Sequence, residues 1–184
     1  MVAVVGIDPG GTGAAVRIET PYTLDVVRFK GRDYSDWDVG LSKLFGKRFF
    51  LTVCIEQVHA MPTDGKQSAF IFGRNTGVAI GISISNGFPV EYVDPGTWQL
   101  EFGLGSIPDD GTGRTKKSQR KAAHQAKARE LLPGIDMQLD VCDAYLIAEY
   151  AWRKEHGTLQ PPKTHDGVKR GTGIIRSTEF RSRN

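Results

Sequence analysis

Three short apolar segments open the chain, separated by turns that contain glycine or proline. They cover residues 2–8, 13–19 and 24–30 and are rich in valine and isoleucine. Short β-branched runs bounded by turn residues are typical of strands, so this pattern predicts a three-stranded meander. A nearly continuous apolar run over residues 49–56 predicts a fourth strand, buried on both faces. Residues 88–94 predict a fifth.

Helical periodicity follows the meander and alternates with the last two strands. It predicts helices over residues 36–45, 66–86, 116–132 and 140–155. Strands first, then alternating helices and strands, favour an α/β domain with a mixed five-stranded sheet flanked by helices on both faces. Residues 103–113 are rich in glycine and predict a mobile loop.

Length and composition bound the organisation of the chain. Its 184 residues favour one domain. After Gly157 the sequence turns polar, basic and rich in glycine and proline, which is typical of segments that do not fold alone. We therefore expect a folded domain over residues 1–156 and a flexible basic tail over residues 157–184.

Cysteine usage and hydropathy indicate the compartment. Cys54 and Cys142 fall inside predicted core elements, so we interpret them as buried thiols rather than a disulfide framework. No secretory signal opens the chain, and no apolar run approaches the roughly 20 residues of a membrane span. We expect a cytoplasmic protein that is not secreted and has no membrane partner.

Positive charge is concentrated in two segments, although the net charge is only +3. Residues 111–129 hold seven Lys or Arg and no acid, and residues 157–184 hold six against two acids. Basic stripes suit a phosphodiester ligand, because cations hold its backbone; solvated helix faces are the alternative. The candidate DNA-binding residues are Arg114, Lys116, Lys117, Arg120 and Lys121.

Four carboxylates are the main candidates for chemistry: Asp8, Glu56, Asp140 and Asp143. Asp8 and Glu56 end the first and fourth predicted strands, which can be neighbours in a mixed sheet. Asp140 and Asp143 are three residues apart, so they share one helix face. Buried carboxylates are costly unless a positive charge lies among them. An all-oxygen cluster suits Mg²⁺ or Mn²⁺, commonly as a two-metal site that displaces groups at phosphorus.

Each acidic segment also has a simpler explanation. The run from Gly6 to Gly13 could be a hairpin turn with an incidental Asp8, although its glycines are expected to allow positive φ and to let phosphate approach. Glu56 could reach solvent from a strand end. Acids at a helix N-terminus complement its dipole by about 0.3–1 kcal/mol, which explains Asp140 and Asp143 less well if one of them points inward.

Together these segments resemble the RuvC family of Holliday junction resolvases, in the ribonuclease H-like superfamily. The resemblance runs from about residue 2 to residue 155. Its segments, in order, are Gly6-Ile7-Asp8-Pro9-Gly10, Ile55-Glu56-Gln57-Val58, Gly77-Val78-Ala79-Ile80, Pro89-Val90-Glu91-Tyr92 with Pro95, Lys116-Lys117-Ser118-Gln119, and Asp140-x-x-Asp143-Ala144. Four acidic positions in this order make the match more specific than any one motif.

The resemblance implies a metal-dependent endonuclease that binds four-way and other branched DNA junctions as a homodimer and makes paired symmetric nicks. The four carboxylates would hold two Mg²⁺ ions, with Mn²⁺ as a substitute and no nucleotide cofactor. Some family members carry His where this chain has Asp140. The family often has an aromatic wedge after the second acidic strand; here His59, Met61 and Phe70 are the candidates.

Gly73, Gly77 and Gly81 recur every fourth residue on the long predicted helix. Glycine inside a helix costs about 1 kcal/mol relative to alanine, so this stripe suggests that another backbone approaches closely. Two explanations of this stripe are open. The helix could pack on the protein's own sheet, or the stripe could form a homodimer interface, which is our sharper hypothesis.

The remaining histidines and tryptophans carry no ligand-like pattern. His124, His156 and His165 are interpreted as surface residues, and Trp98 and Trp152 as core or helix-face aromatics.

Two other classes of function compete with the nuclease. The Asp8–Gly13 segment is also similar to the phosphate loop of actin/hexokinase-type nucleotide-binding proteins, but that fold needs two such domains and gives no role to Asp140 and Asp143. A non-catalytic junction-binding protein would leave the acidic set unexplained, because acids repel DNA phosphates unless metal is present.

Overall fold

The computed structural model describes residues 3–20, 23–29, 33–46, 51–57, 65–106, 111 and 115–159. Its strands are β1 (Ala3–Asp8), β2 (Ala14–Thr20), β3 (Thr23–Arg28), β4 (Leu51–Glu56) and β5 (Val90–Val93). Its helices are α1 (Tyr34–Phe45), α2 (Lys66–Ser85), α3 (Pro95–Glu101), α4 (Lys116–Leu131) and α5 (Leu139–Glu155). These confirm the five strands and four helices that the sequence predicts, whereas α3 was not anticipated. Most of the expected tail, residues 160–184, and much of the expected 103–113 loop lie outside the described residues.

The five strands form one mixed sheet in the order β3-β2-β1-β4-β5. The meander pairs antiparallel, whereas β1 and β4 run parallel with Ile7 beside Ile55. β5 then pairs parallel with β4. This confirms the predicted sheet, and it places the carboxyl ends of β1 and β4 next to each other.

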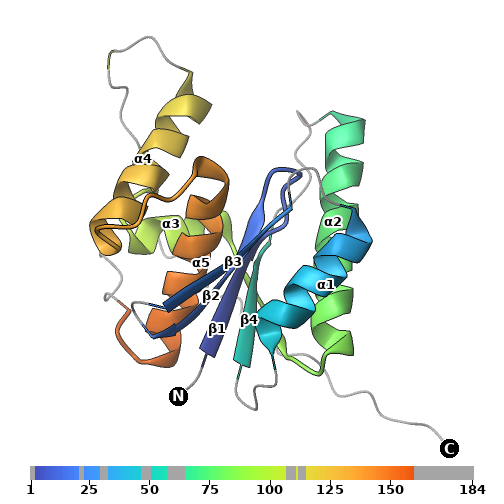
Figure 1. The fold of residues 1–184 in the computed structure, drawn as a ribbon. Coiled ribbons are helices and arrows are strands. Elements are labelled where there is room, and N and C mark those ends of the chain that lie inside the picture. Colours follow the sequence, from blue (N-terminus) through green and yellow to red (C-terminus); the bar gives the residue numbers. More distant parts are fainter. Residues whose placement is uncertain are drawn as a thin grey trace, which may run out of the picture.

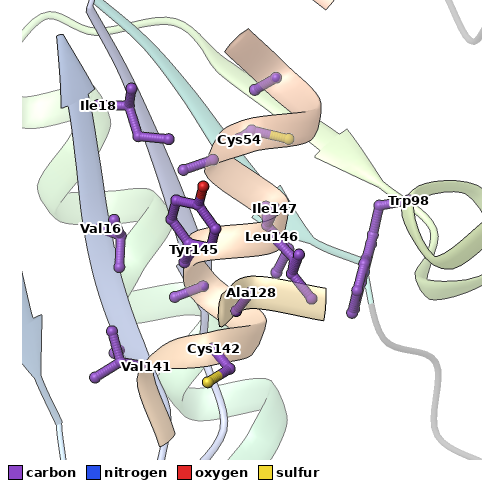
Figure 2. Packing of buried hydrophobic residues seen from close by; sticks show 14 of the residues in the cluster. Val16, Ile18, Cys54, Trp98, Ala128, Val141, Cys142, Tyr145, Leu146 and Ile147 are labelled. Carbon is purple, nitrogen blue, oxygen red and sulfur yellow. The ribbon is translucent and has the colours of Figure 1, made fainter. Parts of the chain in front are cut away.

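Helices cover both faces of the sheet (Figure 1). α1 and α2 pack on one face, where Val5 and Ile7 of β1 join their core cluster. α3, α4 and α5 lie on the other face, with Val4 of β1 in the second cluster. Figure 2 shows α5 between Val16 of β2 and Trp98 of α3. Because side chains alternate along a strand, Asp8 and Glu56 belong to the α5 face.

Gly6 allows α5 to lie directly against β1. A Cβ atom at Gly6 would lie 2.2 Å from the backbone N of Ala148 and 2.6 Å from the carbonyl oxygen of Ala144. At Gly13, a Cβ would lie 2.0 Å from the carbonyl oxygen of Asp8. Neither glycine has positive φ, so the positive φ that glycine allows is not used at either position. They are required by close packing around β1 and its turn.

Two further expectations concern cysteines and membranes. Cys54 and Cys142 are buried free thiols, and burial raises their pKa values to about 12 and about 11, which keeps both protonated. Within the described residues, every helix is too short or too polar to cross a lipid bilayer.

Candidate active site

Two of the predicted carboxylates end adjacent parallel strands. Asp8 is the last residue of β1 and Glu56 the last of β4, each one position beyond the paired residues Ile7 and Ile55. The backbone N of Gly10 donates a hydrogen bond to Asp8 Oδ1 at 2.9 Å, which orients this carboxylate within its turn. The sequence prediction that β1 and β4 bring Asp8 and Glu56 together agrees with this arrangement.

The third carboxylate, Asp143, comes from the first turns of α5. Its negative charge acts on both Asp8 and Glu56, so the helix presents it toward the strand ends. Lys121 of α4 lies 3.7 Å from Asp143 Oδ2 and partly offsets the combined charge. Three of the four predicted acids therefore form one electrostatic cluster.

Asp140 is engaged elsewhere. Its Oδ2 accepts hydrogen bonds from the guanidinium of Arg28 on β3, with Nε at 2.7 Å and the second nitrogen in closer contact. Asp140 precedes Asp143 by three residues, yet its side chain is turned to the outer strand of the meander. Sequence spacing places both acids on one helix face, but it does not reveal the competing cation on β3.

Burial and mutual repulsion make the cluster costly to ionise. Burial is the main cause that raises the pKa of Asp8 from 3.8 to about 6, and the charge of Asp143 adds to it. Burial likewise raises the pKa of Glu56 from 4.5 to about 8, reinforced by the charge of Asp8. Perturbed carboxyl groups of this kind are concentrated at functional sites.

Two aromatic side chains that the sequence did not mark as functional hold the cluster. Trp98 Nε1 donates to Glu56 Oε1 at 3.0 Å, and His124 Nδ1 lies 2.7 Å from Asp143 Oδ1. Trp98 is a core residue, as expected, at 1% exposure. His124 is only 3% exposed, so its assignment to the surface was wrong. Its place four residues before Ala128, on the buried stripe of α4, was the available signal.

A cleft of about 250 Å³ is lined by two carboxylates of the cluster, Glu56 and Asp143. Its lining also includes Trp98 and His124, together with the cations Lys117, Arg120 and Lys121 of α4. Lys116 is exposed at the start of the same helix, and Arg114 lies outside the described residues. Three of the predicted DNA-binding residues thus share one cleft with two of the predicted metal ligands.

The chemistry of the donors suits a divalent cation, although the side chains are not closed around one. Among the described residues, no group of three or more His, Cys, Asp or Glu is arranged so that it could hold a metal ion. Asp8, Glu56 and Asp143 nevertheless supply only oxygen donors, which Mg²⁺ prefers, and burial, together with the neighbouring negative charge, raises the pKa values of Asp8 and Glu56. Binding would require the three side chains to reorient.

Two solved structures of Thermus thermophilus RuvC are similar to this chain. The structure of T. thermophilus RuvC in complex with a Holliday junction substrate matches with a TM-score of 0.58 at 15% identity, covering 88% of this chain and 99% of that chain. A second Thermus thermophilus RuvC structure gives a TM-score of 0.55 at 18% identity, with coverage of 87% and 99%. The chain has a RuvC-like, ribonuclease H-like α/β fold. At this identity the similarity establishes the fold alone.

Sequence comparisons do not identify a family for this chain. No protein-family model and no curated protein sequence matches the chain. The function of the chain is therefore inferred from the residues that the fold brings together.

The position of Asp140 leads to a graded prediction. Replacing Asp143 by Asn should reduce divalent-metal binding far more than replacing Asp140 by Asn, because Asp140 is paired with Arg28 outside the cluster. We expect a loss of at least about 10-fold in Mn²⁺ affinity for Asp143→Asn and a smaller loss for Asp140→Asn, measured by calorimetry. Equal losses would mean that Asp140 leaves Arg28 and joins the cluster when metal binds.

The raised pKa values predict how stability depends on pH in the metal-free protein. Asp8 and Glu56 bind protons more tightly in the folded state, so their stabilising effect is complete below pH 4 and is lost as pH rises through about 6 and about 8. We expect the free energy of unfolding in EDTA to fall by on the order of 2–4 kcal/mol between pH 5 and pH 9, after allowance for side-chain relaxation. Denaturant titration at each pH measures this free energy of unfolding.

Glu56→Gln is the matched variant for this pH prediction, because Gln keeps an oxygen that accepts from Trp98 but does not ionise. This variant should remove most of the change in the free energy of unfolding between pH 6 and pH 9. A wild-type profile that stays level over this range, or rises, would contradict the electrostatic description of the cluster.

Proposed function

We propose that this protein is a metal-dependent endonuclease that resolves four-way, or Holliday, junctions and other branched DNA by paired symmetric nicks. The observation that carries the proposal is the shared cleft, which is lined by the half-buried carboxylates Glu56 and Asp143 together with the cations of α4, one of which, Lys121, lies close to Asp143. Carboxylates so close to a phosphate-binding surface would repel DNA unless a metal ion neutralised them. The RuvC-like fold also supports the proposal of an endonuclease.

In this proposal the carboxylates hold the metal and the cations hold the DNA. Asp8, Glu56 and Asp143 would bind Mg²⁺ or Mn²⁺, and Asp140 would contribute to a second, weaker site only after releasing Arg28. Two such ions supply charge stabilisation to the attacking and leaving oxygens of an in-line displacement at phosphorus. Lys117, Arg120 and Lys121 line the cleft, where they would hold phosphates beside the carboxylates and fix the register of the strand.

Symmetric nicking needs two sites, and an exposed stripe on α2 supports a homodimer. Gly73, Gly77 and Gly81 are exposed, and a Cβ at any of them meets no described atom within 4 Å. The stripe therefore does not pack on the protein's own sheet. Phe70 and Ile84, 69% and 62% exposed, lie on the same helix face. We propose this face as the dimer interface; Phe70 is then less available as a junction wedge, and His59 and Met61 lie outside the described residues.

Gly77→Leu tests this interface. A Cβ at Gly77 meets no described atom within 4 Å, so we expect normal folding but a dimer dissociation constant raised at least 10-fold, measured by analytical ultracentrifugation. Gly96→Leu on α3 is the matched control, because its Cβ also meets open space and it lies on another helix. A Gly77→Leu protein that remains a dimer at the wild-type concentration would refute this interface.

Cleavage of end-labelled synthetic substrates tests the function. In Mg²⁺ the wild type should nick a four-way junction at paired, symmetric positions and leave a linear duplex of the same sequence intact. Equal cleavage of both would indicate a nuclease without selectivity for branched DNA. Tight junction binding with no cleavage in Mg²⁺ or Mn²⁺ would favour a non-catalytic junction-binding protein.

A further inference from the structure

Within the described part of the chain, each carboxylate of the cluster is joined by one hydrogen bond to a protein donor. The bonds are Gly10 N to Asp8 Oδ1 at 2.9 Å, Trp98 Nε1 to Glu56 Oε1 at 3.0 Å, and His124 Nδ1 to Asp143 Oδ1 at 2.7 Å. A carboxylate has two oxygens, so each bond fixes the orientation of the group through one oxygen. The second oxygen of Asp143, Oδ2, already lies 3.7 Å from the cationic Nζ of Lys121. The first donor belongs to the turn after β1, whereas the other two come from helices α3 and α4.

His124 is placed for this one contact. Its side chain is 4% exposed, and its second nitrogen, Nε2, is buried without a hydrogen-bond partner among the described residues. An unsatisfied buried nitrogen is unfavourable, so the bond to Asp143 is the polar interaction that the buried ring provides. An ionised carboxylate only accepts hydrogen bonds, which places the shared proton on Nδ1.

Trp98 and His124 also support each other. Their rings meet edge to face, with centroids 5.1 Å apart at 68°. Both side chains line the cleft, and Trp98 is fixed in the core shared by α5 and the sheet. The pair therefore connects Glu56 on β4 with Asp143 on α5 through two hydrogen bonds and one ring contact.

We propose that His124 and Trp98 are positioning residues that hold Asp143 and Glu56 in the orientation that binds the divalent metal. The inference rests on the proposed function for the identity of the bound cation. Hydrogen-bond partners of metal ligands typically contribute 10–100-fold to metal affinity. The effect should appear in the binding of the metal alone, with no DNA present.

Calorimetric titration of the full chain with Mn²⁺ tests the proposal. Asn can place its amide N–H near the position of Nδ1, whereas Gln places it near Nε2. His124→Gln should therefore raise the Kd for Mn²⁺ by about 10–100-fold, and His124→Asn should stay near the wild type. Trp98→Phe keeps a ring against His124 but removes the donor to Glu56, and it should raise the Kd by about 10-fold.

The outcomes separate this inference from the proposed function. Unchanged Kd values in both His124→Gln and Trp98→Phe would overturn it, and equal weakening by Asn and Gln would show that packing, rather than the Nδ1 bond, is what matters. If the variants weaken Mn²⁺ binding as expected but the wild type cuts no DNA, the inference stands and the nuclease proposal fails. A wild type that binds no Mn²⁺ would overturn both.

Discussion

Replacing Asp8 by asparagine is expected to slow junction cleavage by about 10³-fold. Asp8 lies at the end of the central strand β1, interacts with both Glu56 and Asp143, and is buried enough to have its pKa raised to about 6. Loss of its charge removes a ligand from any cation held there. Metal ions contribute several kcal/mol of transition-state stabilisation, and each 1.36 kcal/mol corresponds to a factor of ten in rate.

The measurement is the single-turnover rate on a labelled four-way junction at saturating Mg²⁺. Asp38→Asn is the matched control. It replaces the same residue type by asparagine, but at an exposed position of α1, on the opposite face of the sheet. It should retain the wild-type rate. If Asp8→Asn cuts within threefold of the wild type, the active site lies elsewhere.

Replacing Gly6 by alanine is expected to destabilise the fold by at least about 3 kcal/mol, the upper part of the range for overpacked cores. The added methyl group would lie 2.2 Å and 2.6 Å from backbone atoms of α5, which cannot move aside as a flexible side chain can. β1 and α5 would have to separate, and this would also displace Asp8 from Asp143.

Denaturant unfolding measures the effect of Gly6→Ala, with Gly11→Ala as its control. Gly11 belongs to the same glycine-rich segment, but a Cβ there meets no described atom within 4 Å, so its effect should stay within about 0.5 kcal/mol. Equal stability of the two variants would contradict the close approach of α5 to β1.

More of the fold than of the candidate site could be predicted from the sequence. Apolar runs that end in Asp8 and Glu56 predicted two strands whose ends can be neighbours in a mixed sheet, and β1 and β4 do pair, in parallel. This prediction was accessible because strand burial leaves a local, periodic pattern. α3 was missed because it is a short helix of seven residues, which leaves almost no periodic signal.

The contacts around the carboxylates could not be read from local patterns. Arg28 and Asp140 are 112 positions apart in the sequence, and Trp98 and Glu56 are 42 positions apart. Such contacts depend on tertiary packing. His124 was assigned to the surface because it had no metal-ligand spacing, yet its bond is to another side chain rather than to a metal.

The rate of junction cleavage as a function of free Mg²⁺ tests the central claim most directly. The wild-type protein, freed of metal with EDTA, should leave a labelled four-way junction intact, and added Mg²⁺ should restore paired nicks along a saturable curve. Cleavage that persists in EDTA, or a junction that stays intact in both Mg²⁺ and Mn²⁺, would contradict the account of a carboxylate cluster that acts through a divalent metal.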